Sequence, residues 1–187
     1  MKGPNENLNK AATTNGITVG VISLTIGVLT YYVMPSLMGS TFYGIGVMVF
    51  LLGVYIFFTF DLRKKVGGYW SFKEALKGIF LMAVVSGLIT TIGNAIFYKF
   101  IEPGAYEKIS GYVVNGLSST YESIGMDQEK IDSTIEKVEE SLKKQFNPSL
   151  ADVFKGLGIS ILTGFIMSLI FAAIFKKERP IFLNAEQ

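Results

Sequence analysis

Residues 11–60 read AATTNGITVGVISLTIGVLTYYVMPSLMGSTFYGIGVMVFLLGVYIFFTF and contain no Asp, Glu, Lys, Arg or His. Two further charge-free stretches cover residues 78–98 and 156–175. An α-helix rises about 1.5 Å per residue, so it crosses a hydrocarbon core of roughly 30 Å in about 20 apolar residues. The first stretch is long enough for two crossings, and Pro35 interrupts it near its middle. The pattern therefore predicts an all-α membrane protein with four transmembrane helices.

The remaining segments are arranged around these spans. We expect, in chain order, a flexible polar N-terminus (1–15), transmembrane helices one to three (16–100) with a basic connector (61–77), an acidic extramembrane segment (101–148), transmembrane helix four (149–175) and a basic tail (176–187). Spans of a β-barrel would instead alternate apolar and polar residues over about ten positions. The charge-free stretches are apolar on all sides, which favours helices.

The acidic segment contains two apolar repeats with helical spacing. The first comprises Tyr106, Ile109, Val113, Leu117, Tyr121 and Ile124, and the second comprises Ile131, Ile135, Val138 and Leu142. Steps of three and four residues place each set on one narrow helix face. Gly125 is expected just after the first helix and Asp127 at the N-cap of the second. The pattern predicts an extramembrane α-helical hairpin, whose apolar faces cover each other, bind a partner or a second copy, or lie on the bilayer.

The distribution of basic residues predicts the orientation. Four spans place both termini and the connector on one side of the membrane, and that side carries ten basic and five acidic residues. Residues 101–155 carry six Lys and ten Asp or Glu. Because cytoplasmic segments are enriched in Lys and Arg, we expect both termini in the cytoplasm and the hairpin on the opposite side.

Small residues recur along the spans at steps of three or four. We expect helix packing at Gly16, Gly20, Gly27, Ala83, Gly87, Asn94, Gly156, Ser160, Gly164 and Ser168. Such faces let helix backbones approach closely, either within one chain or between copies in a homo-oligomer. Asn94 is the most polar side chain within a span, and we expect it to form a hydrogen bond to a neighbouring helix, with a substrate ligand as the alternative.

The basic connector is the densest cluster of chemically distinctive residues. The candidates for anchoring in the lipid bilayer or for binding a cytoplasmic partner are Arg63, Lys64, Lys65, Tyr69 and Trp70. Lysine and arginine attract anionic lipid, and Tyr and Trp suit the headgroup layer. Ser71 and Glu74 have the spacing of a capping box at the start of span three, and Ser149 and Asp152 have it at the start of span four. For the hairpin, the candidate partner residues are Ile131, Ile135, Val138 and Leu142.

Several classes of function are disfavoured by composition. The chain has neither Cys nor His, which removes thiol nucleophiles, imidazole acid–base chemistry and most zinc sites. We expect no catalytic, cofactor or metal site, and a net charge of +2 does not favour nucleic acid. No carboxylate, amine or guanidinium group lies within the charge-free stretches of the predicted spans, so an ion-coupled transporter is disfavoured. We therefore expect a structural or interaction role, as a scaffold or accessory subunit. The alternative is a transporter or channel subunit for a small solute, lined by Ser23, Thr90, Asn94 and Ser160.

The chain also resembles a known family at several short motifs. They are the connector at residues 63–78 with Gly67-Gly68 and Ser71-Phe72-Lys73-Glu74-Ala75, the end of span three with Asn94, Tyr98 and Glu102-Pro103, residues 125–140, and Lys176-Lys177. At these residues the chain is similar to a bacterial membrane-protein family, domain of unknown function 4199. The resemblance implies a four-helix bacterial inner-membrane protein with a helical insert before the last span, and it implies no activity.

Overall fold

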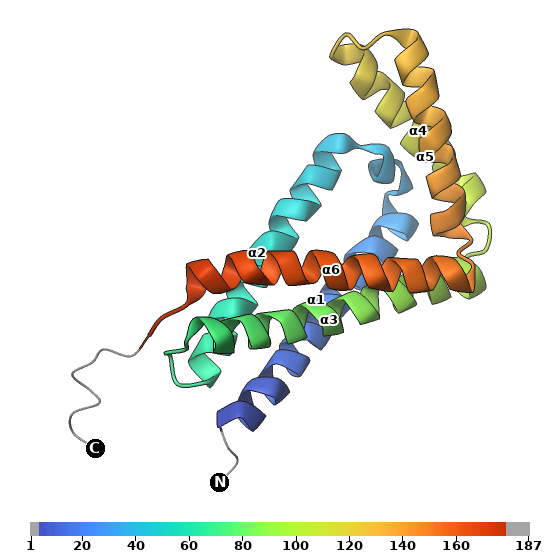
Figure 1. Ribbon diagram of the computed structural model, residues 1–187. Helices are drawn as coiled ribbons and strands as arrows, with labels where there is room; N and C mark the ends of the chain where they lie inside the picture. The colour runs from blue at the N-terminus through green and yellow to red at the C-terminus, as the bar shows by residue number, and fades with distance from the viewer. Residues whose placement is uncertain (1–3, 179–187) are drawn as a thin grey trace, which may run out of the picture. The chain divides into compact units, whose positions relative to one another are not determined.

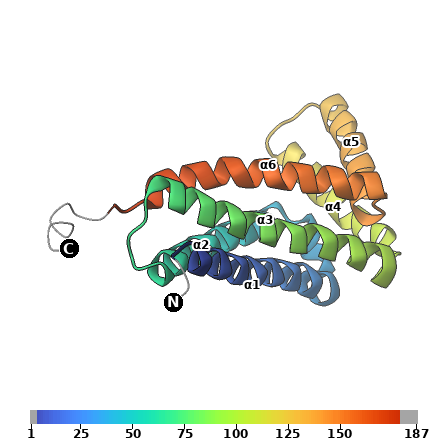
Figure 2. The same cartoon turned by 60° about the horizontal axis from the view of Figure 1, so that its bottom comes forward.

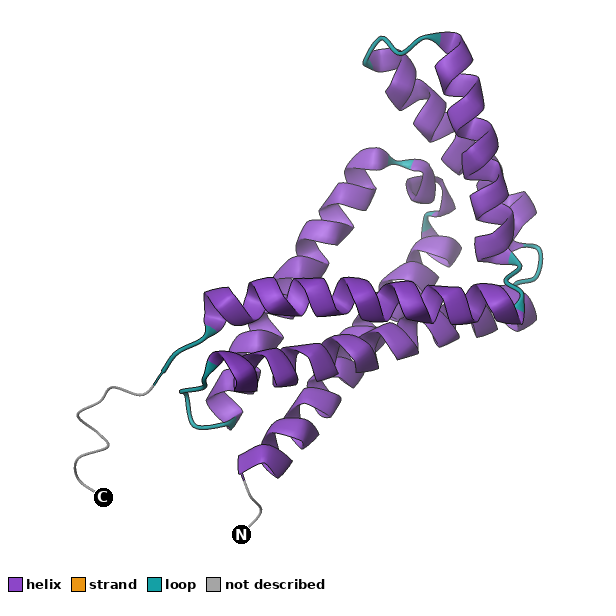
Figure 3. Ribbon diagram, in the orientation of Figure 1, coloured by secondary structure: helices purple, strands orange, loops and turns teal. Residues whose placement is uncertain are grey.

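The computed structural model describes residues 4–178, most of which are helical (Figures 1 and 3). The elements in chain order are α1 (Pro4–Val33), the 3₁₀ helix η1 (Pro35–Gly39), α2 (Thr41–Lys65), α3 (Phe72–Ile96), the π helix η2 (Phe97–Ile101), α4 (Ala105–Ser123), α5 (Gln128–Phe146) and α6 (Leu150–Phe175). Within residues 4–178, the only β pairing is an isolated antiparallel bridge between Trp70 and Lys177.

Four helical segments are long and apolar enough to cross a membrane. They are Asn7–Val33, Thr41–Lys65, Phe72–Ile101 and Leu150–Phe175. Their charge-free stretches supply the length of about 20 residues that a crossing requires. The prediction of an all-helical chain with four membrane-crossing helices is thus confirmed.

The first helix begins earlier than the sequence suggested. We expected residues 1–15 to be flexible, but α1 begins at Pro4, and residues 1–3 lie outside the described range. Leu8, Ala12, Asn15 and Val19 are all buried. Their steps of four, three and four place them on one helix face, so the helix that crosses the membrane continues into the polar segment. The low overall hydropathy of that segment hid this repeat.

The chain forms two compact units. Within the described residues, the first comprises 4–21, 52–89 and 157–178, and the second comprises 22–51 and 90–156. In the described part of the first unit, buried residues from α1, α2, α3, α6 and the α2–α3 connector form one core: Leu8, Leu62, Trp70, Ala75, Ile79, Met82 and Phe171. Within this unit α3 and α6 lie side by side in both views (Figures 1 and 2).

The second unit is built around aromatic residues. Its buried core comprises Tyr31, Phe97, Tyr98, Ala105, Ile109, Leu142 and Phe146. Helices α4 and α5 pack against each other, and η1 packs against α4. The turn of η1 comes close enough that a Cβ atom at Gly116 would collide with the carbonyl of Gly39. Glycine at both positions permits this backbone contact.

The chain reverses its direction at the turn between α4 and α5. Gly125 has a φ of +74°, a conformation that favours glycine, and it follows the last residues of α4. The N–H of Met126 donates to the carbonyl of Tyr121, and the N–H of Gly125 donates to that of Glu122. This pair of bonds is a Schellman motif, as expected for Gly125 at this position. Asp127 occupies the N-cap position of α5, but its carboxylate makes no capping hydrogen bond and lies 3.2 Å from Lys130 Nζ instead.

Candidate functional site

A carboxylate held by two tyrosines joins three elements of the second unit. Tyr31 and Tyr32, near the end of α1, donate hydrogen bonds of 2.9 and 2.5 Å to Oε2 and Oε1 of Glu102. Lys108, in the first turn of α4, places its Nζ 4.0 Å from the centre of the Tyr31 ring. The hydroxyls of Tyr32 and Tyr31 hold the pKa of the Glu102 carboxyl below its usual range, because they stabilise its charged form. This Glu102 clamp therefore ties the end of the first span to the start of α4.

The Glu102 clamp is in contact with a row of aromatic rings, which begins at Tyr31. The ring of Tyr31 meets that of Phe97 edge to face at 5.4 Å, and Phe97 meets Tyr98 at 5.1 Å. Tyr98 in turn meets Phe146, at the end of α5, at 4.6 Å. Edge-to-face pairs add about 0.5–1.5 kcal/mol each beyond the burial of their surface. The row thus connects α1, η2 and α5 in one rigid layer.

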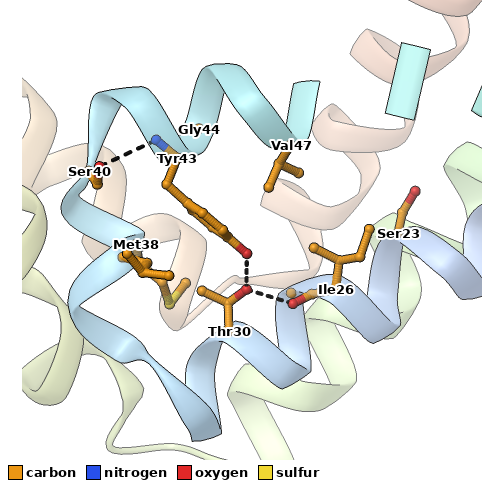
Figure 4. Close-up of a pocket in the computed structure, with 10 residues that line it drawn as sticks. Ser23, Ile26, Thr30, Met38, Ser40, Tyr43, Gly44 and Val47 are labelled. Atoms are coloured by element: carbon orange, nitrogen blue, oxygen red, sulfur yellow. Dashed lines mark hydrogen bonds between the residues drawn. The ribbon is translucent and has the colours of Figure 1, made fainter. Parts of the chain in front are cut away.

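A first cavity, of about 260 Å³, lies where α1, η1 and α2 meet in the second unit. Its wall is mostly apolar and is formed by Ser23, Ile26, Gly27, Thr30, Leu37, Met38, Ser40, Tyr43, Gly44 and Val47. Figure 4 shows Tyr43 reaching across from α2 to the hydroxyl of Thr30, which also donates to the carbonyl of Ile26 at 2.8 Å. The polar groups on this wall therefore bond mainly to one another. We expected Gly27 to pack against another helix, but a Cβ atom at this position would meet open space.

A second cavity, of about 210 Å³, lies in the second unit where α3, α5 and α6 meet. We call it the Asn94 cavity; it is lined by Thr91, Asn94, Ala95, Lys144, Gln145, Pro148, Asp152 and Val153. Asn94 is exposed here, and within residues 4–178 its carboxamide makes no hydrogen bond to a neighbouring helix. The expected structural bond is therefore not formed, because the side chain points into this cavity. Lys99 donates to the carbonyl of Pro148, one of the lining residues, at 3.2 Å.

The small faces of α3 and α6 meet along their lengths. A Cβ atom at Gly164 would lie 3.2 Å from Cβ of Ala83, and one at Gly87 would collide with the hydroxyl of Ser160. One at Gly156, in the second unit, would lie 3.5 Å from the methyl group of Thr91. Ser168 is buried and donates to the carbonyl of Gly164 at 2.6 Å. These candidate positions thus pack within the chain.

Two other candidate glycines bring α1 close to α3 in the first unit. A Cβ atom at Gly16 would lie 2.7 Å from the carbonyl of Met82, and one at Gly20 would lie 2.9 Å from Cβ of Ile89. Ser23 lines the first cavity, Asn94 lines the second and Ser160 packs against Gly87. In the second unit, Ser23 and Asn94 thus line different cavities.

The basic connector is bound to the end of α6. Nε1 of Trp70 donates to the carbonyl of Phe175 at 2.8 Å, and Nη1 of Arg63 lies 3.4 Å from the same oxygen. Trp70 is only 2% exposed. We expected it to face the headgroup layer; within the protein it packs into the core of the first unit, where its indole N–H satisfies a carbonyl left free at a helix end. Lys64 and Lys65 remain exposed, and Lys177 Nζ lies 5.1 Å from the centre of the Tyr69 ring.

Helix α2 continues beyond the charge-free stretch and carries ionisable residues at its end. Helix α2 continues to Lys65, and Asp61 forms an ion pair of 2.5 Å with Lys65 Nζ. The buried Asn15 bridges them: its Nδ2 donates to Asp61 Oδ2 at 2.9 Å, and its Oδ1 accepts from Lys65 at 3.1 Å. Paired charges are tolerated near a span's end, which explains the extra turn. Asn15 lies in the segment expected to be flexible, and no spacing pattern in the sequence indicates this contact.

The apolar stripe of α5 is covered. Ile131 and Leu142 are buried, and Ile135 and Val138 are half-buried. These four residues were candidates for a partner surface, but the stripe faces inwards because α4 carries a complementary stripe. The opposite side of α5 exposes an acidic stripe: Glu129, Asp132, Glu136 and Glu140. Within residues 4–178 no group of three or more Asp and Glu side chains is placed to hold a metal ion.

The helices and the comparison with known families together define the class. Four helices long and apolar enough to cross a membrane indicate a multi-pass membrane protein. A family model, "Protein of unknown function (DUF4199)", matches residues 14–177. The chain belongs to this family, as its motifs indicated. No curated protein and no solved structure is significantly similar to it.

Proposed function

We propose that this chain is an inner-membrane interaction protein without catalytic activity. It crosses the bilayer four times with both termini in the cytoplasm, and its α4–α5 pair forms an extramembrane docking element for a protein partner. The distribution of Lys and Arg supports this orientation, since ten basic residues belong to the segments assigned to the cytoplasm. The close contact of Gly39 with Gly116 supports a common side of the membrane for the α1–α2 turn and α4.

One observation carries the docking role. Helix α5 buries its apolar stripe against α4 and leaves the acidic stripe exposed, so its free face is charged rather than apolar. A charged face of this kind favours a partner with basic residues and suits a reversible contact. The Glu102 clamp and the row of aromatic rings hold the pair firmly on the ends of the spans. Binding at a rigid surface loses little conformational entropy.

The docking role is tested by removing two charges from the stripe. The double variant Glu129→Gln/Glu136→Gln is compared with Glu107→Gln/Glu122→Gln, which removes two exposed charges from α4. After crosslinking in intact cells and purification in detergent, the α5 variant is expected to retain about fivefold less of a specific partner, as for loss of two exposed ion pairs of about 0.5 kcal/mol each. Identical partners at equal yield in wild type and both variants would contradict the proposal.

The orientation is tested by labelling, for which the chain is suited because it has no native Cys. A membrane-impermeant maleimide is applied to spheroplasts carrying either Glu136→Cys or Lys64→Cys, both at exposed positions. We expect Glu136→Cys to react at once and Lys64→Cys to react only after the membrane is permeabilised. The reverse order would place the α4–α5 pair in the cytoplasm and overturn the topology.

A further inference from the structure

The Asn94 cavity is lined by one basic and one acidic side chain that attract each other without forming a direct ion pair. Lys144 lies at the end of α5 and Asp152 lies in the first turn of α6, and both line the cavity. In the described part of the chain no ion pair joins them. Lys144 Nζ instead lies 2.6 Å from Glu140 Oε1, and Asp152 caps the start of α6. A ligand that carries both charges would complete the arrangement.

Both charged groups keep free bonding capacity. A lysine ammonium has three N–H donors, and the bond to Glu140 uses one of them. The N–H and the hydroxyl of Ser149 donate to the same carboxylate oxygen of Asp152, Oδ2, at 3.0 and 2.5 Å. The other oxygen of Asp152 therefore remains available as an acceptor. The carboxamide of Asn94 adds two donors and an acceptor on the opposite wall.

The position of the cavity indicates what kind of molecule reaches it. Thr91 and Asn94 lie within the third membrane-capable segment, Asp152 lies in the first turn of the fourth, and Lys144 lies outside both. The cavity therefore spans the boundary between an apolar and a polar environment. Beside its lining, Ile92 and Phe154 are 43% and 71% exposed. Exposed apolar side chains near the ends of the membrane-capable segments are suited to contact the acyl chains of lipids.

We propose that the Asn94 cavity binds the phosphoethanolamine headgroup of a membrane lipid. Lys144 and Asn94 donate to the phosphate, and Asp152 accepts from the primary ammonium. The volume of about 210 Å³ fits a headgroup, since it is below the roughly 300–1,000 Å³ of pockets that enclose drug-sized ligands. A phosphoglycerol headgroup lacks the cation, and a choline headgroup lacks N–H donors, so neither satisfies Asp152 equally. The proposal requires membrane insertion but no protein partner.

The test measures which lipid stays with the whole protein. The chain is reconstituted in vesicles of phosphatidylethanolamine, phosphatidylglycerol and phosphatidylcholine in equal parts, extracted in mild detergent, and analysed by native mass spectrometry. We expect the ethanolamine lipid to be enriched over the other two. Lys144→Gln should reduce that enrichment about fivefold, as for loss of an ion pair near 1 kcal/mol, and Lys144→Arg should largely retain it.

A matched control separates the cavity from general surface charge. Lys137→Gln removes an exposed lysine from the same helix, two turns away from the cavity, and should leave the enrichment unchanged. Equal lipid profiles in wild type and Lys144→Gln would overturn the proposal. Displacement of the lipid by soluble phosphoethanolamine at equal concentration would overturn the lipid assignment and indicate a solute site. If the α5 charge variants lose a protein partner and their lipid enrichment is unchanged, the result supports the docking role and the independence of the lipid site from it.

Discussion

Tyr31 donates a hydrogen bond of 2.9 Å to Glu102, although 71 residues of chain separate them. The bond links the end of the first membrane-capable helix to the residue that precedes Pro103, where the third such segment has ended. Tyr32 binds the second oxygen of the same carboxylate. The Glu102 carboxylate thereby joins the end of α1 to the segment that leads into α4.

The Glu102 clamp should weaken in acid. The tyrosines lower the pKa of the Glu102 carboxyl below its unperturbed value of 4.5, so its stabilising effect is present above that value. The effect is lost as the pH falls through the lower pKa of the folded state. We expect the difference in Tm between wild type and Glu102→Gln in detergent to shrink as the pH falls below 4.5. A difference that stays constant or grows in acid would contradict this assignment.

The contact between η1 and α4 should not tolerate a side chain. Gly116→Ala places a methyl group against the carbonyl of Gly39, which is backbone and cannot rotate away. We expect a loss of about 1–3 kcal/mol in the free energy of unfolding. Gly111→Ala on the same helix meets open space and should stabilise by up to about 1 kcal/mol. Equal Tm values for the two variants would rule out the close contact.

The single tryptophan should report the packing of the connector. Trp70 is buried, so its fluorescence should resist quenching by aqueous acrylamide. Trp70→Phe removes the hydrogen bond to the Phe175 carbonyl and should destabilise by about 1 kcal/mol or more. Tyr69→Phe, at the neighbouring half-buried position, provides the control and should have a smaller effect. Strong acrylamide quenching in the wild type would instead place Trp70 at the surface.

Asn15 should contribute to stability through its side-chain bonds. Asn15→Leu leaves Asp61 and the Phe58 carbonyl without the Nδ2 donor, which lies 3.1 Å from that carbonyl. We expect a loss of about 1–2 kcal/mol, measured by thermal unfolding in detergent. Thr14→Val is the control, since the Thr14 hydroxyl bonds only to the carbonyl of Lys10 in its own helix. A stability change no larger than that of the control would show that the Asn15 bonds contribute little.

Features set by neighbouring residues could be read from the sequence. The Ser71–Glu74 capping box forms, with Ser71 N–H donating to Glu74 Oε2 at 2.8 Å, and the equivalent pair Ser149 and Asp152 forms at the start of α6. Gly125 ends α4 with the expected positive φ. In each case the interacting groups lie within one helical turn of each other, so the spacing along the chain is enough to predict the contact.

Features that join distant segments could not be read in this way. The sequence around Trp70 is typical of a headgroup anchor, and nothing in it indicates the hydrogen bond to the Phe175 carbonyl at the end of α6. Asn15 looks like part of a loose terminus until Asp61 and Lys65 approach from α2. The cavity around Asn94 requires three helices to meet, and nothing in the spacing of Asn94, Lys144 and Asp152 indicates that they share it.

The sequence alone determined that this chain has four membrane-crossing helices, because hydropathy over about 20 residues is a local sum. It also determined most helix ends, because caps and turns involve adjacent residues. Only the tertiary structure decided which polar groups bond across helices, where the apolar stripe of α5 is covered and which glycines pack. Those outcomes depend on the complementary shapes and charges of segments that meet only after folding.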